Sequence, residues 1–532
     1  MRKVTFKSVL SCAAVVCAMS LFTSCDEVMS KLDNPVSSYL TVNQNDGIVL
    51  NLDTIYQITA STINSDKPVT YKSSDTKIAT VDANGLVTPV AEGDVEITVA
   101  VEASDYYTAG EQKVKIAVMQ PLTFEALEDG TINVNYNYGI TLDEPIYYSF
   151  DRMKTKKAIT TTTPIPVKKG QKIQFESAND HTGDYGPYDF GYGTYNTNRY
   201  VSIQPQSKCA VYGNLMSMIT PDGNYHTNKT ITKPYALQYL LQGNYNWDGT
   251  EYVYYTLQHD KYDLLLPATE LTYCCYYYTL AYTGIKKAPV LPATKLAYGC
   301  YEYMFANCSS LKKAPALPVT DLESSCYQGM FQNCTSLTEA PALPATTLAP
   351  SCYRTMFNGC TSLKKAPALP AKEMTNYCYY SMFNGCTALE AAPALPATTL
   401  AYYCYRNMFY RCTSLKKAPA LPATTLAYGC YQAMFQSCYN MEGEIELPAE
   451  TLTYQCYSQM FYGCSKLSKV TCLAKGDSDY RSLYYWLRNA GTAVDSPVFV
   501  RNTDNSNWAN NNGYGNYAWY VPTNWTITPA IE

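Results

Sequence analysis

The chain has 532 residues and a formal net charge of −5, from 45 acidic and 40 basic side chains. A length of this order predicts several domains, and the mildly acidic balance excludes the strongly basic composition of nucleic-acid-binding proteins. Tyrosine occurs 52 times and histidine only three times, which suits an extracellular recognition surface better than an acid–base active site.

The N-terminus has the pattern of a secretion signal. A basic segment, Met1 to Lys7, precedes an apolar run from Val9 to Phe22. This run is too short to span a bilayer and predicts a signal peptide. The small residue Ser24 before Cys25 resembles the lipobox of bacterial lipoproteins, although Phe22 stands where Leu is commoner. The resemblance implies that Cys25 is lipidated and becomes the first mature residue; an ordinary cleaved signal is the alternative.

Two acids, Asp26 and Glu27, follow the predicted lipidation site. They resemble the export signal of Bacteroidetes-type lipoproteins that are moved to the outer face of the outer membrane. The alternative is that both acids merely solvate a short tether. No later run approaches eighteen apolar residues, so the lipid on Cys25 would be the membrane attachment.

Residues 38–119 show short alternating runs separated by turn signals. Asn84-Gly85 is typical of a hairpin turn because glycine accepts a positive φ. Val95, Ile97 and Val99 alternate with polar residues, so one face of that strand is expected to be buried. The pattern predicts a β-sandwich. The series from Tyr71 to Gly93 resembles the bacterial Ig-like group 2 module, which implies a spacer or an adhesive unit.

Residues 120–262 predict a second all-β domain. Strand-like runs occur at 131–136, 146–150 and 172–175. The segment 183–200 is dense in tyrosine and glycine, which fits either a recognition loop or a flexible surface loop. The sequence does not identify a ligand for this domain.

A 26-residue repeat occupies most of the remaining chain. Each unit contains Leu-Pro, then Cys-Tyr-x-x-Met-Phe-x-x-Cys, then a leucine-containing extended stretch. The unit starts fall at Leu291, Leu317, Leu343, Leu369, Leu395, Leu421 and Leu447, with a shorter copy from Leu266. Such a period predicts a solenoid, in which neighbouring coils bury one another's apolar side.

Each coil is predicted to hold one short helix and one short extended segment. Cys300, Met304 and Cys308 are spaced at i, i+4 and i+8, which fits one face of a helix. Pro315 disfavours helix in the stretch from Leu311 to Leu317. We therefore expect an α/β leucine-rich-repeat solenoid.

The repeated cysteines raise the question of disulfide bonds. Eight helical residues would separate the Cα atoms of Cys300 and Cys308 by about 12 Å, whereas a disulfide needs less than about 7 Å. We therefore expect columns of buried thiols rather than a disulfide framework. No Cys-x2-Cys spacing or nearby histidine indicates a metal site.

One column of the repeat carries charges that vary from coil to coil. It contains Lys312, Thr338, Lys364, Glu390, Lys416 and Glu442. Basic coils tend to alternate with acidic or neutral ones, which avoids like charges on adjacent strands. The column is either a charged binding face or a solvated face with compensated charges.

The coil Met356-Phe357-Asn-Gly-Cys360-Thr-Ser-Leu363 resembles the BspA-type leucine-rich repeat of bacterial surface proteins. That family's usual unit is about three residues shorter. The resemblance implies a surface-displayed recognition scaffold, in several members an adhesin, and it implies no catalytic residues.

Candidate ligand contacts are aromatic. One tyrosine recurs at the same place in each coil and either forms an exposed stripe or packs between coils. These residues are Tyr301, Tyr327, Tyr353, Tyr379, Tyr405, Tyr431 and Tyr457. After the repeat, residues 473–532 hold Trp486, Trp508, Trp519 and Trp525, which fit a cap over the last coil. Trp508, with Asn507, Asn510 and Asn511, is the alternative sugar-stacking site.

The sequence thus predicts a non-catalytic lipoprotein on the cell surface that binds an extracellular protein through its solenoid. Glycan capture and a passive spacer are the alternatives. No catalytic motif, metal site, cofactor site or nucleic-acid partner is expected, and the oligomeric state is left open. The expected organisation is signal peptide 1–25, tether 26–37, Ig-like sandwich 38–119, all-β domain 120–262, leucine-rich-repeat solenoid 263–472 and C-terminal cap 473–532.

Overall fold

A computed structural model describes residues 35–44, 48–52, 54–185, 198–221, 223–247, 252–475, 481–506, 508–510 and 520–530. The predicted signal peptide, Cys25 and the two following acids lie outside the described residues. The chain forms two compact units, residues 1–120 and 121–532. Among the described residues, the only helical element is the 3-10 helix η2 (Leu215–Met218), and no helix is long and apolar enough to cross a membrane.

The first unit is an all-β sandwich. Its three sheets have the orders β1-β4, β2-β9-β8-β5 and β3-β7-β6. The strands are β1 (Tyr39–Val42), β2 (Ile48–Leu50), β3 (Tyr56–Gln57), β4 (Ala60–Ile63), β5 (Thr70–Ser73), β6 (Ala79–Val81), β7 (Leu86–Pro89), β8 (Gly93–Val101) and β9 (Gly110–Val118).

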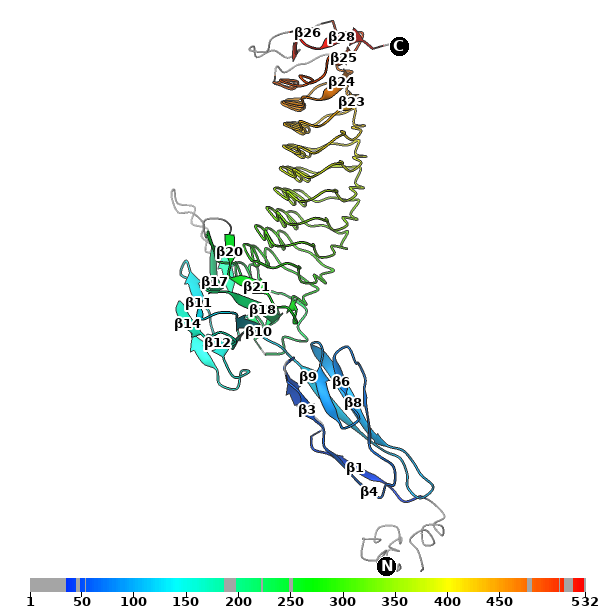
Figure 1. Cartoon of the computed structure of the whole chain (residues 1–532). Helices are drawn as coiled ribbons and strands as arrows, with labels where there is room; N and C mark the ends of the chain where they lie inside the picture. Colours follow the sequence, from blue (N-terminus) through cyan, green and yellow to red (C-terminus); the bar gives the residue numbers. More distant parts are fainter. Residues whose placement is uncertain are drawn as a thin grey trace, which may run out of the picture. The chain divides into compact units, whose positions relative to one another are not determined.

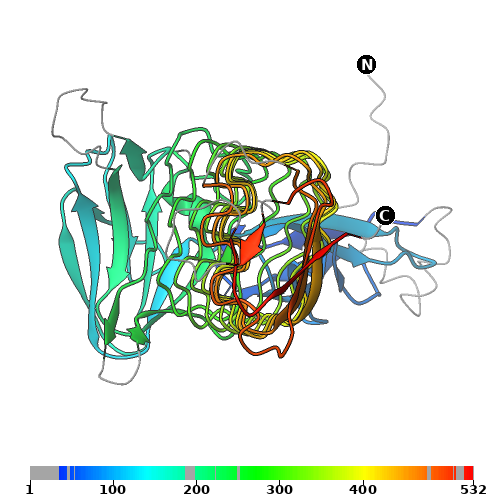
Figure 2. The same ribbon diagram turned by 90° about the horizontal axis from the view of Figure 1, so that it is seen from above.

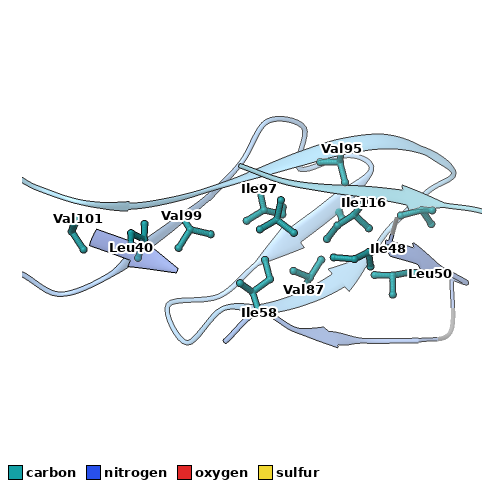
Figure 3. Packing of buried hydrophobic residues seen from close by; sticks show 13 residues of the cluster. Leu40, Ile48, Leu50, Ile58, Val87, Val95, Ile97, Val99, Val101 and Ile116 are labelled. Carbon is teal, nitrogen blue, oxygen red and sulfur yellow. The ribbon is translucent and has the colours of Figure 1, made fainter. Parts of the chain in front are cut away.

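The core of this unit confirms the alternation expected from the sequence. Val95, Ile97 and Val99 on β8 are buried, and Figure 3 shows them in one row with neighbouring aliphatic side chains. Gly85 adopts a φ of 82° in the predicted turn. A Cβ atom there would lie 2.7 Å from the carbonyl oxygen of Ile58, so both the conformation and the close packing require glycine.

The second unit begins with two larger β-sheets and the separate two-stranded sheet β19-β20. One has the order β13-β12-β15-β10-β18-β21, with β22 also paired to β18, and the other has the order β14-β11-β17-β16. The strands are β10 (Leu122–Ala126), β11 (Gly130–Asn137), β12 (Ile146–Ser149), β13 (Lys157–Ile159), β14 (Thr163–Val167), β15 (Lys172–Ser177), β16 (Gly183–Tyr185), β17 (Asn198–Pro205), β18 (Cys209–Asn214), β19 (Tyr245–Trp247), β20 (Tyr252–Tyr254), β21 (Thr256–Gln258) and β22 (Leu264–Leu265). The three predicted strand runs correspond to β11, β12 and β15.

These sheets continue directly into the solenoid. β18 pairs in parallel with β21 and β22, and Leu257 forms a parallel bridge with Gly284 in the first repeat coil. Backbone stacking between coils starts still earlier, because the N–H group of Tyr235 donates to the Tyr273 carbonyl at 2.9 Å. The sequence gives no hint of this coil, since the segment around Tyr235 lacks the Cys-Tyr-x-x-Met-Phe pattern.

The repeat coils contain no helix, so the predicted α/β character of the repeat is wrong. Within each Cys-to-Cys segment, successive backbone N–H groups donate alternately to a carbonyl of the same coil and to a carbonyl of the next coil. Met304 donates to the Tyr301 carbonyl at 3.2 Å within its own coil, whereas Tyr301 donates to Cys326 of the next coil at 3.0 Å. An α-helix would keep every such bond inside the segment. We call this arrangement the turn ribbon, defined by residues 299–308 and their equivalents.

Every fourth residue of the turn ribbon has a positive φ. In the coil of Cys300 these are Gly299, Tyr303 and Asn307, with φ of 57°, 54° and 61°. Each is the third residue of a tight turn closed by an i to i+3 hydrogen bond, the position that has a positive φ in a type II turn. The turn ribbon therefore repeats every four residues, which places Cys300, Met304 and Cys308 on the same side of it. Successive turns, and not a helix, produce this period.

The extended part of each coil pairs in parallel with its neighbours. Single bridges connect Lys313 to Glu339, Glu339 to Lys365 and Lys365 to Ala391, which confirms the predicted extended segment and its alignment. Toward the C-terminus the bridges lengthen into a parallel sheet of order β23-β24-β25-β28. Its strands are β23 (Gly443–Leu447), β24 (Leu467–Cys472), β25 (Val498–Arg501) and β28 (Thr526–Pro529), beside the short pair β26 (Ala509–Asn510) and β27 (Tyr520–Val521). Figures 1 and 2 show the stacked coils of this unit from two directions.

Aromatic columns fill the solenoid core. Successive rings of the Tyr301 column lie parallel, with 5.9 Å between the centroids of Tyr301 and Tyr327. The Phe305 column does the same, with 5.7 Å between Phe305 and Phe331. All are essentially inaccessible to solvent. Identical residues therefore recur because each ring packs on its own copy in the next coil.

The repeat cysteines are free and buried, which confirms the prediction of thiol columns although the helix used to argue it is absent. In the column of Cys308 each thiol donates to a backbone carbonyl of the preceding coil. Cys334 Sγ lies 3.1 Å from the Phe305 oxygen, and Cys386 Sγ lies 3.1 Å from the Phe357 oxygen. Cysteine thus supplies a small apolar side chain with one weak donor.

The tryptophans after the repeat cover the last coils. Trp486 is fully buried and lies 6.4 Å, centroid to centroid, from Phe461, the final phenylalanine of its column. Trp525 Nε1 donates to the Ala490 carbonyl at 3.0 Å. Trp519 lies outside the described residues. These contacts are those expected of a cap.

Thiol reactivity tests this packing. Residues 26–532 contain the eighteen buried free cysteines from Cys209 onward, and burial raises the pKa of thiols such as Cys386. Because the thiolate is the reactive form, we expect almost no reaction with a thiol reagent in the native state and full reaction in denaturant. Rapid native modification of a large fraction of the thiols would contradict the buried columns.

Candidate binding surface

The seven repeated tyrosines predicted as candidate ligand contacts do not form a surface. Tyr301, Tyr327, Tyr353, Tyr379, Tyr405, Tyr431 and Tyr457 are each about 1% exposed. The turn ribbon directs them inward beside the first cysteine of every coil, where they stack on one another. They are therefore corrected to core residues, which was the other interpretation that the sequence allowed.

Trp508 is also buried, at 5% exposure. Its ring lies 4.6 Å from Phe499 and 5.5 Å from Trp486, centroid to centroid. A sugar-stacking site needs an open ring face, so this position does not provide one. Of the neighbouring amides, Asn507 and Asn511 lie outside the described residues, and the side chain of Asn510 is not described.

Comparison of the coils with one another identifies the variable surface. The buried Cys, Tyr, Met and Phe recur in every coil from 300 to 464. The residue type varies between coils at three positions: two before the first cysteine, one before it and two after it. Most of these positions are exposed or half-buried, although Tyr403, Gln432 and Ser458 are buried. In the coils of Cys352 to Cys456 they are occupied mainly by tyrosine and arginine.

We call this cluster the Tyr–Arg surface. It consists of Arg354, Tyr377, Tyr380, Tyr402, Tyr403, Arg406, Tyr428 and Tyr454. Its centre is Tyr380, whose ring has the guanidinium carbon of Arg354 at 5.0 Å and that of Arg406 at 5.7 Å. Arg406 also lies 4.5 Å from the Tyr403 centroid. Such distances fit cation–π contacts.

A row of tyrosines runs beside this centre. Tyr402, Tyr428 and Tyr454 stack with 4.9 Å between successive centroids. Tyr402 is 36% exposed and Tyr428 is 38% exposed. Arg481 continues the row, with its guanidinium 5.6 Å from the Tyr454 centroid. Sequence reasoning missed this surface, since it sought identical residues and these positions differ between coils.

Neither central arginine forms an ion pair with a carboxylate of the described residues, although Arg354 lies near enough to Glu302 to oppose the rise in its pKa. No carboxylate of the described residues lies within ion-pair distance of Arg354 or Arg406. The Nε atom of Arg406 is buried without a hydrogen-bond partner among the described residues. Residues 350–441 hold eight basic and two acidic side chains, a formal net charge of +6, within a chain whose net charge is negative.

Gly429 makes room for one of the tyrosines. Its φ is 56°, and a Cβ atom there would lie only 2.1 Å from Cε1 of Tyr403. The ring of Tyr403 crosses this glycine, and its hydroxyl donates to Gln455 Oε1 at 3.2 Å. The absence of a side chain at position 429 therefore fixes where Tyr403 lies.

A buried carboxyl occupies the same column as the arginines, two coils away. Glu302 Oε1 accepts a hydrogen bond from Gln328 Nε2 at 2.6 Å, and the next residue of the column is Arg354. Burial raises the pKa of Glu302 to about 7, against a smaller opposing effect of Arg354. Glu302 is therefore a carboxyl that ionises near neutral pH.

Other hollows of the second unit are less distinctive. Two grooves of about 310 and 460 Å³ lie between the Ala-Pro segments of adjacent coils, around Pro393 and Pro315. An open hollow of about 560 Å³ has a mixed lining of Asp180, threonines and asparagines of 220–232, and the apolar Ile219, Pro221 and Ile231. Across the described part of the chain, no group of three His, Cys, Asp or Glu residues is arranged to hold a metal ion.

Gly429→Ala tests the packing of Tyr403. An alanine with positive φ costs about 1–2 kcal/mol, and displacement of the Tyr403 ring adds about 1 kcal/mol. Gly463→Ala is the matched control, because Gly463 also has a positive φ but the nearest atom to its Cβ would be 3.6 Å away. We expect a larger loss of unfolding free energy for Gly429→Ala in denaturant titrations. Equal losses would show that Tyr403 is not held there.

Glu302→Gln tests the buried carboxyl. The folded chain retains the proton on Glu302 up to about pH 7, whereas the unfolded chain releases it near its ordinary pKa. Stability is therefore lost as the pH rises between these values, by up to about 3 kcal/mol. We expect the glutamine variant to have a higher Tm than the wild type at pH 8 and no advantage at pH 4. A pH-independent difference would contradict the raised pKa.

Comparison with known families agrees with this architecture. The model of the bacterial Ig-like domain (group 2) matches residues 48–110. The model of the BspA type leucine rich repeat region matches six copies, over residues 298–416 and 378–481. No curated protein matches the chain. The chain thus carries a bacterial Ig-like group 2 domain followed by a region of BspA-type leucine-rich repeats.

Proposed function

We propose that this chain is a non-catalytic adhesin, attached to the outer membrane through a lipid on Cys25, that binds an extracellular protein through its solenoid. Proteins with BspA-type repeats are typically surface-associated, and Ig-like and leucine-rich-repeat domains are typically non-catalytic binding domains. The signal-peptide pattern of the first 25 residues supports export.

The Tyr–Arg surface is the observation that carries this proposal. The core positions of the repeat are nearly invariant from coil to coil, while the outward positions differ and gather tyrosine and arginine. These two residue types are enriched at the energetic centres of protein interfaces. Exposed Tyr402 and Tyr428 are already held in one geometry by stacking, which lowers the entropy lost on binding.

The alternative of glycan capture draws less support from the same residues. It depended on the repeated tyrosines and on Trp508, all of which are buried. A passive spacer would need no cluster of partly exposed aromatic and cationic side chains. Protein recognition is therefore the function that we favour.

The test is binding of soluble residues 26–532 to parallel panels of extracellular matrix proteins and glycans. We expect saturable binding to a protein, weakened at least about thirtyfold by Tyr402→Ala with Tyr428→Ala, since interface tyrosines contribute on the order of 1–2 kcal/mol each. Tyr439→Ala is the matched control, because Tyr439 is 51% exposed but lies outside the Tyr–Arg surface.

Two results would decide against the adhesin, and a third would only relocate its binding site. Glycan binding without protein binding would favour the capture of carbohydrates. Absence of binding to both the protein and the glycan panels would favour a spacer. If the double variant Tyr402→Ala with Tyr428→Ala binds the protein as well as the wild type does, the adhesin function stands but the Tyr–Arg surface is excluded as its contact.

A further inference from the structure

We propose that the Tyr–Arg surface binds an acidic polypeptide segment, with its carboxylates on the guanidinium groups of Arg354 and Arg406. This inference rests on the proposed function and gives the partner a chemistry. It depends on three features of the surface: cations that form no ion pair with a carboxylate of the described residues, aromatic rings whose faces are already occupied, and a positive charge confined to a few coils.

The guanidinium groups are oriented but not neutralised. Arg354 and Arg406 belong to the coils before and after that of Tyr380, and their guanidinium groups lie 5.0 and 5.7 Å from its ring centroid. Stacking uses the flat faces of a guanidinium group and leaves its N–H edges for hydrogen bonds. Arg406 Nε is itself buried, so a partner would meet the terminal Nη groups of this half-buried side chain. A carboxylate is the acceptor that fits such a planar edge with two parallel hydrogen bonds.

The tyrosines favour a polypeptide over a neutral sugar. Tyr402 and Tyr428 are stacked at an interplanar angle of 26°, and Tyr428 and Tyr454 at 30°. Their inner ring faces are therefore covered by one another, and what an approaching ligand meets is mainly ring edges and hydroxyl groups. Hydroxyl groups can donate to carboxylates and to backbone carbonyls, whereas a sugar ring needs an open aromatic face.

The spacing of the two cations suits an extended chain. Arg354 and Arg406 belong to coils two apart, which places them about 10 Å apart at the ordinary spacing of neighbouring strands, the length of about three residues of an extended polypeptide. Two nearby acids of one segment could therefore reach both arginines. A partner with clustered glutamates or aspartates satisfies this requirement.

The surrounding charge supports the same partner. The net charge of +6 is limited to residues 350–441, and the next stretch turns acidic with Glu442, Glu444, Glu446 and Glu450. An acidic segment would be attracted to the coils of the Tyr–Arg surface and repelled from those that follow. Complementary fields of this kind set the orientation and the rate of association.

The experiment measures binding of a fluorescent glutamate peptide of about ten residues to residues 26–532, with heparin and a neutral glycine–serine peptide in parallel. The test variant is Arg354→Gln with Arg406→Gln. The matched control is Lys364→Gln with Lys416→Gln, which removes the same charge from exposed lysines of the extended face. Circular dichroism and Tm confirm that each variant is folded.

We expect the arginine variant to bind the glutamate peptide at least about tenfold more weakly, as for lost charge-assisted hydrogen bonds. The lysine control should change affinity by less than about threefold, because it acts only through screened long-range charge. Arg354→Lys with Arg406→Lys keeps the charge but loses the planar edge, so its affinity should fall between the two.

Equal effects of the arginine and lysine variants would overturn the proposal, because binding would then follow net charge alone. Heparin binding that depends on Arg354 and Arg406, without binding of the glutamate peptide, would assign the surface to a sulfated glycan instead. If matrix proteins bind while the arginine variant leaves their affinity unchanged, the adhesin function stands and only the acidic-segment inference fails.

Discussion

The structure of the second unit depends on how the backbone N–H groups of the turn ribbon are shared between coils. In the coil of Cys300, five N–H groups donate to the next coil, from Gly299, Tyr303 and the residues alternating with them. Two non-glycine residues of that coil, Tyr303 and Asn307, have a positive φ, which costs about 1–2 kcal/mol each, while each hydrogen bond contributes on the order of 1 kcal/mol. The hydrogen bonds therefore leave only a small surplus in each coil. Most of the stability of the stack comes from the apolar side chains that the ribbon directs inward.

This constraint explains the composition of the repeat. Because coils are held in a fixed register by backbone hydrogen bonds, each core side chain faces its own copy, and a residue is retained if it packs well on itself. Tyrosine and phenylalanine do so as nearly parallel rings with centroids 5.6 to 6.0 Å apart. Cysteine does so in another way, since the Cys334 thiol fits beneath the preceding coil and donates to the Phe305 carbonyl. The many cysteines are therefore packing residues rather than cross-links.

The sequence was sufficient for whatever depends on periodicity and insufficient for whatever depends on backbone conformation. Alternation located the strand of Val95 to Val99, and the 26-residue period placed Lys313 beside Glu339. The spacing of Cys300, Met304 and Cys308 was taken for a helix because a run of four-residue turns has nearly the same period. One signal could have separated them: glycine or asparagine recurs at the positive-φ positions, as at Gly299, Asn307 and Gly429, where a helix would disfavour glycine.

The candidate surface was missed for a related reason. Repetition identified Tyr301 and its equivalents as notable, but in a solenoid a residue that never changes is one that must fit between neighbouring coils. Residues that contact a ligand belong to single coils and need not repeat, as with Arg354, Tyr380 and Arg406. Binding specificity in such a stack is therefore expected at outward positions that break the repeat, while the repeat itself holds those positions about one coil spacing apart. The Tyr–Arg surface meets both conditions: it departs from the repeat in sequence, and the ribbon beneath it fixes its rings and cations before any partner arrives.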